Sequence, residues 1–362
     1  MTEPAPQRKP SLIGMDREGI QAALGERADA RWRAKQLADW IYGKAAGDWR
    51  AMSDVPQELR KDLAARFEIN PLTVARHLRS SDGVQKLLVH GGDGEVFECV
   101  LLPYEDRVSC CISSQVGCPM GCKFCATGLG GFDRNLSAGE IVGQYLLLQG
   151  LTERRLSHVV FMGMGEPLLN LDSVLEAIRL LHDEVGLSHR HITVSTVGLV
   201  PQIDRLARLK LPIHLALSLH SPLDAVRDRL MPVNKKWPVA EVMASMKRYA
   251  RATGRKITIE YLLIGGLTDS ADQARELARL VRGAPTVVNV IPFNFVKTDE
   301  GFRAPTRDSV RAFKAALKGL GVNVTERVER GQDIAAACGQ LAGEHQGRFA
   351  RRGLSELSIA QP

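Results

Sequence analysis

The feature that most constrains the fold is an alternation of strand-like and helix-like segments between residues 108 and 292. Short apolar runs alternate with longer amphipathic segments. The strand-like runs are residues 108–113, 158–162, 191–195, 213–218, 256–263 and 286–292. The helix-like segments between them are residues 138–148, 171–184, 201–209, 239–252 and 271–282. This order predicts an α/β fold in which right-handed helical crossovers join parallel strands.

Six strand–helix units are too few to close an eight-unit barrel. The sequence therefore predicts a partial (β/α)6 barrel or an open sheet. In both architectures, ligands gather at the carboxyl ends of the strands. Ser137 and Glu140 form the pattern of a capping box, which predicts the start of the first helix.

The segment before this alternation is expected to form separate structures. Residues 1–14 are polar and contain several prolines, so we expect them to be disordered. Residues 15–72 have a helical pattern and predict an accessory module, with helices near 31–42 and 53–67. Trp32, Trp40 and Trp49 lie in this module. They are expected to form its small core, and the alternative is an aromatic and basic surface that binds RNA.

A β-hairpin linker is predicted over residues 73–104, because Gly91-Gly92-Asp93-Gly94 separates two alternating runs at 85–90 and 95–102. Residues 105–342 then form the α/β core together with a C-terminal extension, and residues 343–362 form a basic tail.

Composition and charge narrow the class of protein only slightly. Of the 362 residues, 44% are hydrophobic and 25% are charged, which predicts a folded chain. The net charge of +7 permits an anionic partner without requiring one. Cations recur in residues 297–330, where the alternatives are a phosphate-binding surface and a solvated helix face. Neither a signal sequence nor an apolar run of about 18 residues is present, so we expect a cytoplasmic protein without membrane contact.

Cysteine is distributed very unevenly along the chain. Six of the seven cysteines fall between residues 99 and 125, and the seventh is Cys338. An odd, clustered set is a poor disulfide framework, so it favours a metal or redox site in a reducing compartment.

Three of these cysteines have the spacing of metal ligands. Cys118, Cys122 and Cys125 form a C-x3-C-x2-C motif in the loop after the first predicted core strand. Structural zinc sites and ordinary iron–sulfur sites use four ligands, so three thiolates leave one coordination position open. A zinc site completed by a distant His or by Cys111 remains an alternative.

Polar and small residues follow the later strands on the same predicted side as this loop. Gly165 and Glu166 end the second strand, and glycine permits close approach of a ligand to the backbone. The others are Ser195, Ser218, Leu219, His220 and Asn294. Each alone is also typical of an ordinary turn or helix cap.

The cysteine motif, with Phe124 before its last cysteine, resembles that of the radical S-adenosylmethionine (SAM) superfamily. The resemblance implies that Cys118, Cys122 and Cys125 hold a [4Fe-4S] cluster. In that superfamily SAM chelates the fourth iron through its amino and carboxylate groups. The resemblance further implies that SAM is contacted by Gly165, Glu166, Ser195, Ser218, Leu219, His220 and Asn294.

Three further blocks, residues 111–118, 131–136 and 330–341, are similar to the RlmN/Cfr family of RNA methyltransferases. This resemblance extends from about residue 15 to about residue 350. It implies methylation of adenine C2 in 23S rRNA, at the peptidyl-transferase centre, and in tRNA, at the adenine 3′ to the anticodon. Two alternatives stay open: methylation of C8, as in Cfr, and a non-catalytic, metal-bound RNA-binding protein. The implied partners are 23S rRNA, tRNA and an electron donor such as a flavodoxin or ferredoxin, with the enzyme acting as a monomer.

The same resemblance assigns roles to three residues outside the cluster motif. Cys338 would carry the methyl group, Cys111 would resolve the protein–RNA adduct through a transient disulfide with Cys338, and Glu98 would accept the C2 proton. Neighbouring strand residues point to opposite faces, so only one of Cys110 and Cys111 can face the active centre. Cys110 and Cys99 are therefore expected to be packing residues.

Overall fold

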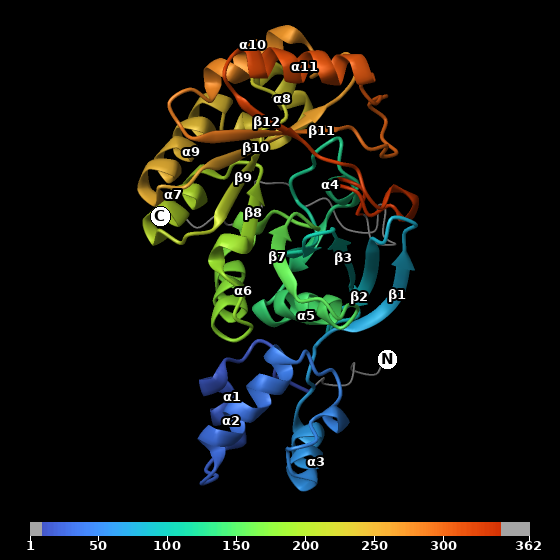
Figure 1. The fold of residues 1–362 in the computed structure, drawn as a ribbon, viewed down its shortest axis with the longest axis vertical. Helices are drawn as coiled ribbons and strands as arrows, with labels where there is room; N and C mark the ends of the chain where they lie inside the picture. Colours follow the sequence, from blue (N-terminus) through green and yellow to red (C-terminus); the bar gives the residue numbers. More distant parts are fainter. Residues whose placement is uncertain (1–8, 342–362) are drawn as a thin grey trace, which may run out of the picture.

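The computed structural model describes residues 9–341, and the predicted tail at 343–362 lies outside them. A helical module lies at the N-terminal end, below the sheet in Figure 1. Its α-helices are α1 (Arg17–Leu24), α2 (Ala30–Ala38) and α3 (Gln57–Arg66). A π-helical turn (Asp39–Gly43) and a 3-10 turn (Trp49–Ala51) connect α2 to α3. Asp16 caps α1 by accepting a hydrogen bond from the Gly19 amide at 2.8 Å.

The core of this module is mainly aliphatic and its buried aromatic residue is Tyr42, which corrects the expectation for tryptophan. Buried residues such as Leu37, Ile41 and Leu63 fill it. Trp40 and Trp49 are only partly buried against it, and the Trp32 side chain is 57% exposed. The expected disorder up to residue 14 is also wrong for part of that segment. Leu12 and Ile13 are buried, and their amides donate to the carbonyl groups of Glu68 and Ile69.

Ten strands within residues 9–341 form one open sheet, in the order β1-β2-β3-β4-β7-β8-β9-β10-β11-β12. From β4 onwards all neighbouring strands are parallel. These strands are β4 (Val108–Cys111), β7 (Leu156–Phe161), β8 (Ile192–Thr196), β9 (His214–Ser218), β10 (Ile257–Leu263), β11 (Thr286–Pro292) and β12 (Asn323–Glu326). The six predicted core strands are confirmed, and β12 is a further parallel strand that the sequence analysis did not identify.

Helices connect the parallel strands and cover the outer face of the sheet (Figure 1). They are α5 (Ala138–Gln149), α6 (Leu171–Asp183), α7 (Val200–Leu209), α8 (Asp224–Leu230), α9 (Val239–Thr253), α10 (Ala271–Leu280) and α11 (Arg307–Gly319). Short 3-10 turns occur at Pro167–Asn170, His189–His191, Pro232–Lys235 and Gln332–Ile334. The capping box at the start of α5 is confirmed, with both reciprocal hydrogen bonds between Ser137 and Glu140.

The predicted hairpin is present, but it belongs to the main sheet. Strands β1 (Thr73–Arg79), β2 (Gln85–His90) and β3 (Val96–Pro103) form an antiparallel ribbon. β3 pairs antiparallel with β4, so the ribbon extends the sheet beyond its first parallel strand. The cysteine motif lies between the strands of a small separate ribbon, β5 (Gln115–Gly117) and β6 (Phe132–Asn135), and is followed by the short helix α4 (Ala126–Gly130).

The segment after β12 crosses from one edge of the sheet to the β1–β3 ribbon near the other edge (Figure 1). The Arg330 guanidinium donates to the carbonyl groups of Pro103 and Asp82. The Ser80 hydroxyl donates to Asp333 at 2.6 Å. These contacts hold residues 330–341, here called the C-terminal strap, across the open side of the partial barrel.

None of the helices in residues 9–341 is both long enough and apolar enough to span a bilayer.

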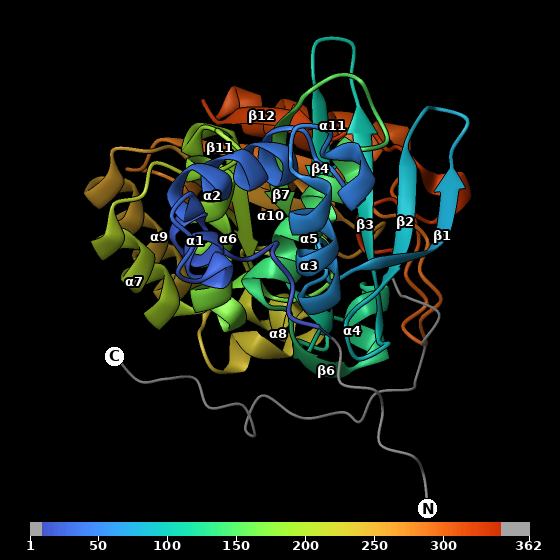
Figure 2. The same cartoon turned by 90° about the horizontal axis from the view of Figure 1, so that it is seen from below.

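The helices of the N-terminal module lie against the core, as the view from the module side shows (Figure 2), and one close backbone contact is between Gly14 and Gly139. A Cβ atom on Gly139 of α5 would lie 2.6 Å from the Ile13 carbonyl oxygen and 3.5 Å from the Gly14 Cα. We therefore expect Gly139→Ala to lower the free energy of unfolding by about 1–3 kcal/mol, because backbone has to move to admit the methyl group. Chemical denaturation measures this change.

Gly150, at the end of the same helix, gives the matched control. Its φ is −66°, and a Cβ atom there would make only ordinary contacts, the nearest at 3.4 Å. Gly150→Ala should leave stability unchanged or raise it slightly. Equal destabilisation by the two substitutions would contradict the proposed close contact.

Candidate functional site

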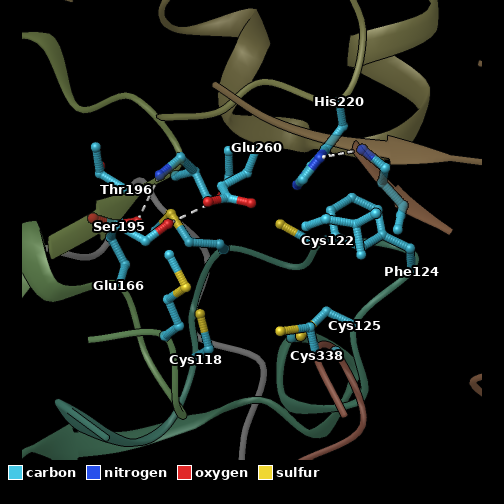
Figure 3. Close-up of a pocket in the computed structure, with 18 of the residues that line it drawn as sticks. Cys118, Cys122, Phe124, Cys125, Glu166, Ser195, Thr196, His220, Glu260 and Cys338 are labelled. Atoms are coloured by element: carbon cyan, nitrogen blue, oxygen red, sulfur yellow. Dashed lines mark hydrogen bonds between the residues drawn. The ribbon is translucent and has the colours of Figure 1, made fainter. Parts of the chain in front are cut away.

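Two cavities lie at the carboxyl ends of the parallel strands. The first has the three motif cysteines, Glu166 and His220 in its wall (Figure 3). The second lies between β3, β4 and the C-terminal strap. The cavities share wall residues, among which are Cys125, Asn294, Arg327 and Cys338.

The small β5–β6 ribbon fixes the base of the cysteine loop. The Cys118 amide donates to the Gly131 carbonyl oxygen at 2.6 Å. Gly117 has a φ of +74°, and a Cβ atom there would lie 2.2 Å from that same oxygen. Only glycine fits this close approach. Farther along the loop, the Lys123 amide donates to the Leu230 carbonyl, which ties the loop to the end of α8.

The thiols of this loop fit an iron–sulfur cluster by their chemistry and placement. Cys118, Cys122 and Cys125 line the first cavity, and burial raises the pKa of Cys118 and Cys122. A bound cationic centre would favour their thiolate forms. Within residues 9–341, no three His, Cys, Asp or Glu side chains converge as ligands of a single metal ion. A cluster makes a different demand, because each thiolate binds its own iron atom and the sulfurs therefore surround the cluster.

Glu166 presents a buried carboxyl group to the same cavity. Its oxygens accept hydrogen bonds from the amides of Leu168 at 3.0 Å and Val197 at 2.8 Å. Burial nevertheless raises the pKa of Glu166 to about 7. A ligand ammonium group would stabilise the ionised carboxylate. Gly165 before it has a φ of +104°, which glycine adopts readily.

Of the predicted residues on β8, on β9 and directly after β9, three line the first cavity and one lies in the core. Ser195, Ser218 and His220 line the first cavity, and the two serine hydroxyls are 3.3 Å apart. Leu219 does not line either cavity and is fully buried. Its carbonyl accepts a hydrogen bond from the buried Arg227 guanidinium at 3.1 Å. Leu219 therefore supports the loop through its backbone.

His220 is a neutral hydrogen-bond donor toward the cavity. Burial lowers its pKa to about 3. Its Nδ1 accepts the Leu262 amide proton at 3.1 Å, so the ring proton is on Nε2. The ring meets Phe124 of the cysteine loop edge to face, with the centroids 4.7 Å apart.

Cys338 is held beside the cysteine loop by the C-terminal strap (Figure 3). The Asn294 amide donates to the Cys338 carbonyl oxygen at 3.2 Å, and the Ala126 amide donates to the Gly339 carbonyl at 2.8 Å. The Asn294 side chain thus lines the cavity and also fixes the strap.

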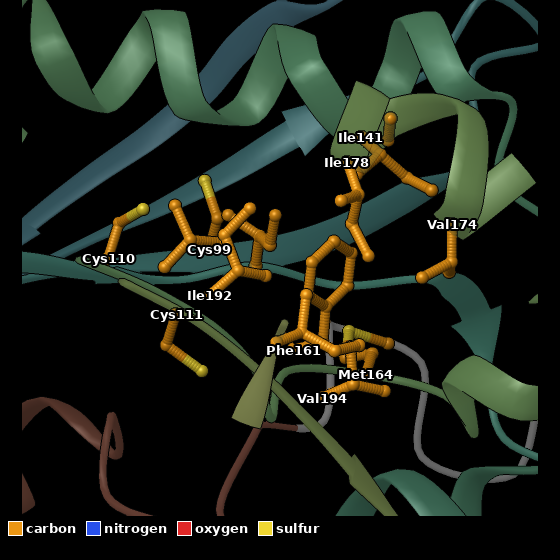
Figure 4. Close-up of a cluster of buried hydrophobic side chains, with 14 of the residues drawn as sticks. Cys99, Cys110, Cys111, Ile141, Phe161, Met164, Val174, Ile178, Ile192 and Val194 are labelled. Carbon is orange, nitrogen blue, oxygen red and sulfur yellow. The ribbon is translucent and has the colours of Figure 1, made fainter. Parts of the chain in front are cut away.

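Cys111 lies on the opposite face of the sheet from Cys99 and Cys110, as the alternation rule predicted (Figure 4). Cys111 pairs with Val100, and both line the second cavity together with Cys338. Burial raises the pKa of Cys111 to about 12, which makes it a thiol in the resting protein. Cys99 and Cys110 are fully buried in the hydrophobic core.

Glu98 lies on the same face of β3 as Val100, but it does not line either cavity. Its carboxylate is buried and lies 3.2 Å from the Lys86 ammonium group.

Two charged residues of the site were missed by the sequence analysis. Glu260 is buried in β10, lines the first cavity and accepts a hydrogen bond from Asn289 at 2.8 Å. An acidic residue in an otherwise apolar strand is a signal that could have identified it. Arg327 follows β12 and lines both cavities. Burial raises the pKa of Cys338, and the positive charge of Arg327 counteracts part of that rise.

The fold and the cysteine loop are those of a radical SAM protein. The model of the Radical SAM superfamily matches residues 112–281. A radical SAM methyltransferase from Sphaerobacter thermophilus has a similar structure, with a TM-score of 0.88 and 43% identity, covering 92% of this chain and 99% of that one. Membership of this superfamily implies a [4Fe-4S] cluster and SAM.

A second model, described as the ribosomal RNA large subunit methyltransferase N-terminal domain, matches residues 11–69. A probable dual-specificity RNA methyltransferase RlmN of Moorella thermoacetica is 45% identical over 352 residues, covering 94% of this chain and 97% of the relative. Its counterpart in Rhodopirellula baltica is also 45% identical, over 338 residues, covering 92% of this chain and 91% of the relative. The chain belongs to the RlmN family of radical SAM RNA methyltransferases.

Gly165 gives a test of the first cavity as the SAM site. A Cβ atom at this position would lie 2.6 Å from the Gln115 Cβ and 2.8 Å from the Ser114 hydroxyl. Gly165→Ala should displace Glu166 and weaken SAM binding about 10-fold or more, which isothermal titration calorimetry measures. Gly319→Ala, on α11 with open space around the position, is the control. Equal SAM affinity of both variants would argue against a site at Glu166.

Proposed function

We propose that this protein methylates C2 of adenine in 23S rRNA, at the peptidyl-transferase centre, and in tRNA, 3′ to the anticodon. The observation that carries the proposal is the position of Cys338. Its side chain is in the wall shared by two cavities, one with the cluster thiols and the other with Cys111. A methyl group on Cys338 would therefore be accessible from a SAM site on one side and from an RNA base on the other.

The cofactors supply the chemistry that side chains lack. C2 of adenine is electron-poor and does not attack a methyl cation donor, so a carbon radical has to add to it. When bound, a reduced cluster would supply the one-electron chemistry that converts SAM into a 5′-deoxyadenosyl radical. Cys118, Cys122 and Cys125 would hold the cluster. Glu166 would bind the SAM amino group, because a cationic partner would stabilise its buried carboxylate. Ser195, Ser218, His220 and Asn294 would complete the SAM site, with Leu219 and Gly165 shaping it.

Three residues of the chain would perform the transfer itself. Cys338 would lose its thiol proton and accept a methyl group from a first SAM. That methyl group would give one hydrogen atom to the 5′-deoxyadenosyl radical, and its carbon would then bond to C2. The adduct would lose one electron, which the bound cluster would accept, and its C2 proton, which Glu98 would accept. The Cys111 thiolate would attack the Cys338 sulfur, and the carbon–sulfur bond would break as the methyl carbon takes up a proton. This would release the methylated base and leave a Cys111–Cys338 disulfide for an external reductant. Arg327, near both thiols, would favour their thiolate forms.

RNA contact would use the surfaces that the fold leaves exposed. In the N-terminal module the Arg33 guanidinium stacks on exposed Trp32 at 4.3 Å, an arrangement suited to a base or phosphate. Near the cavities, the apolar side chains of Phe295 and Val328 are 76% and 79% exposed. On α11 the buried face is apolar, and Arg311 and Lys314 pair with Asp308 and Glu326. These two cations of the basic run at 297–330 are thus paired within the protein, as Arg33 is with Asp29 at 3.0 Å. A flavodoxin or ferredoxin would supply electrons to a monomeric, cytoplasmic enzyme.

The product identifies the reaction. Reconstituted protein, SAM and reductant, incubated with unmodified 23S rRNA and tRNA, should give 2-methyladenosine, identified by mass spectrometry and chromatography after digestion. Formation of 8-methyladenosine would instead establish the alternative, Cfr-like specificity. The absence of any methyladenosine would sink the proposal.

Substitution of Cys338 and substitution of Cys111 should block the reaction at different steps. Cys338→Ala should abolish the product without any adduct, because no methyl carrier remains. Cys111→Ala should accumulate a covalent protein–RNA adduct, which denaturing gel electrophoresis detects. Cys110→Ala is the matched control, since Cys110 faces the core, and it should form no adduct. Full turnover by Cys111→Ala would refute its resolving role.

The cluster ligands can be tested without RNA. Replacing Cys118, Cys122 or Cys125 by Ala should abolish the brown colour and most bound iron after anaerobic reconstitution, whereas Cys99→Ala should retain both. Iron, sulfide and zinc analysis measures the outcome. A colourless wild-type protein with stoichiometric zinc would favour a non-catalytic, metal-bound RNA-binding protein.

A further inference from the structure

Lys86 is a buried lysine that none of the steps above uses. It lies on β2 and is only 5% exposed, and Glu98 on β3 is 3% exposed. The Lys86 ammonium group is 3.2 Å from a Glu98 carboxylate oxygen and donates a hydrogen bond to the Ala335 carbonyl at 3.0 Å. Lysine is rarely this deeply buried unless its charge is paired.

The strand register explains how these groups meet. Lys86 is opposite Val100, and Glu98 is opposite Leu88, so Lys86 and Glu98 are diagonal neighbours on one face of the ribbon. Val100 is in turn opposite Cys111 on β4. The ion pair is therefore on the sheet face that carries Cys111 toward the second cavity.

The Ala335 contact connects this ion pair to the C-terminal strap. Ala335 is three residues before Cys338, and its φ of +50° marks a tight turn there. The strap has other anchors, at Ser80–Asp333 and Asn294–Cys338, so Lys86 is not needed merely to retain it. What Lys86 adds is a direct link between the Glu98 carboxylate and the turn that leads to Cys338.

We infer that Lys86 is the positioning residue for Glu98: its ion pair and its hydrogen bond to Ala335 hold the carboxylate in fixed register with the Cys338 turn. This inference rests on the proposed function, in which Glu98 takes the C2 proton. Lys86 neither gains nor loses a proton in that step. The proton moves from C2 of the covalent adduct to a Glu98 oxygen, whose position the Lys86 ammonium group fixes.

The variant Lys86→Met tests whether Lys86 positions Glu98 or only stabilises the fold, because the two roles affect different steps. Methylation of Cys338 by SAM needs the Cys338 thiolate, which Arg327 favours, and does not use Glu98. Intact-protein mass should therefore show this methylation within about twofold of wild type. Resolution of the protein–RNA adduct should be about 10- to 100-fold slower, because a base contributes 10²–10⁴-fold and loses only part of this when misplaced. Adduct should therefore accumulate on gels. Lys86→Arg, which keeps the charge, should restore most of the resolution rate.

Two further variants keep the inference falsifiable if Lys86→Met folds poorly. The double variant Lys86→Met with Glu98→Gln removes both charges of this ion pair and should resolve the adduct as slowly as Glu98→Gln alone. Arg248→Met, which removes the exposed ion pair to Asp204 on the outer helices, is the control and should match wild type.

The outcomes distinguish failure of the positioning role of Lys86 from failure of the proposed function. The positioning role would be overturned if Lys86→Met slowed Cys338 methylation and adduct resolution equally. It would also be overturned if the double variant resolved the adduct more slowly than Glu98→Gln by the full effect of Lys86→Met. Normal adduct resolution by Glu98→Gln would remove Glu98 as the base, and the inference would fall with it. A wild-type protein that forms no methyladenosine would instead refute the proposed function itself.

Discussion

The docking of the C-terminal strap across the open side of the sheet is the constraint on which the site depends. Seven parallel strands do not close a barrel, and the strap spans the gap from β12 to the β1–β3 ribbon. Arg330, Lys86 and Asn294 donate hydrogen bonds to carbonyl groups of the strap or of the ribbon. The same contacts bring Cys338 beside a cysteine loop more than 200 residues earlier in the chain.

Burial of ionisable groups determines how the site can react. Thiols and carboxyl groups at the ends of the strands are removed from water, which disfavours their charged forms. A positively charged ligand in the first cavity would therefore stabilise the ionised forms of Glu166 and of the cluster thiols, whose pKa values burial raises. Arg327 supplies such charge at the wall between the cavities, and Lys86 supplies it at Glu98. Each cation lies next to a group to which the proposed reaction assigns a step.

Local sequence signals predicted the core strands well, because their apolar runs are long and bounded by amphipathic helices. They failed where the signal was weak or ambiguous. β12 is a four-residue strand with a single buried side chain, so it has no apolar run to recognise. Trp32 was expected in a core because aromatic residues usually provide one, but the aliphatic side chains of α2 and α3 fill that space.

The sequence by itself determined the α/β class, the cysteine loop after the first parallel strand, and the opposite orientations of Cys110 and Cys111. These follow from local periodicity and from motif spacing. Only the tertiary structure decided that the β-ribbon belongs to the main sheet, that Leu219 supports its loop from the core, and that Lys86, Glu98 and Ala335 meet. Such contacts join segments up to 249 residues apart. Local propensity does not predict them, because they form only when distant segments pack together, and the Lys86–Ala335 contact forms only when the strap closes the open side of the sheet.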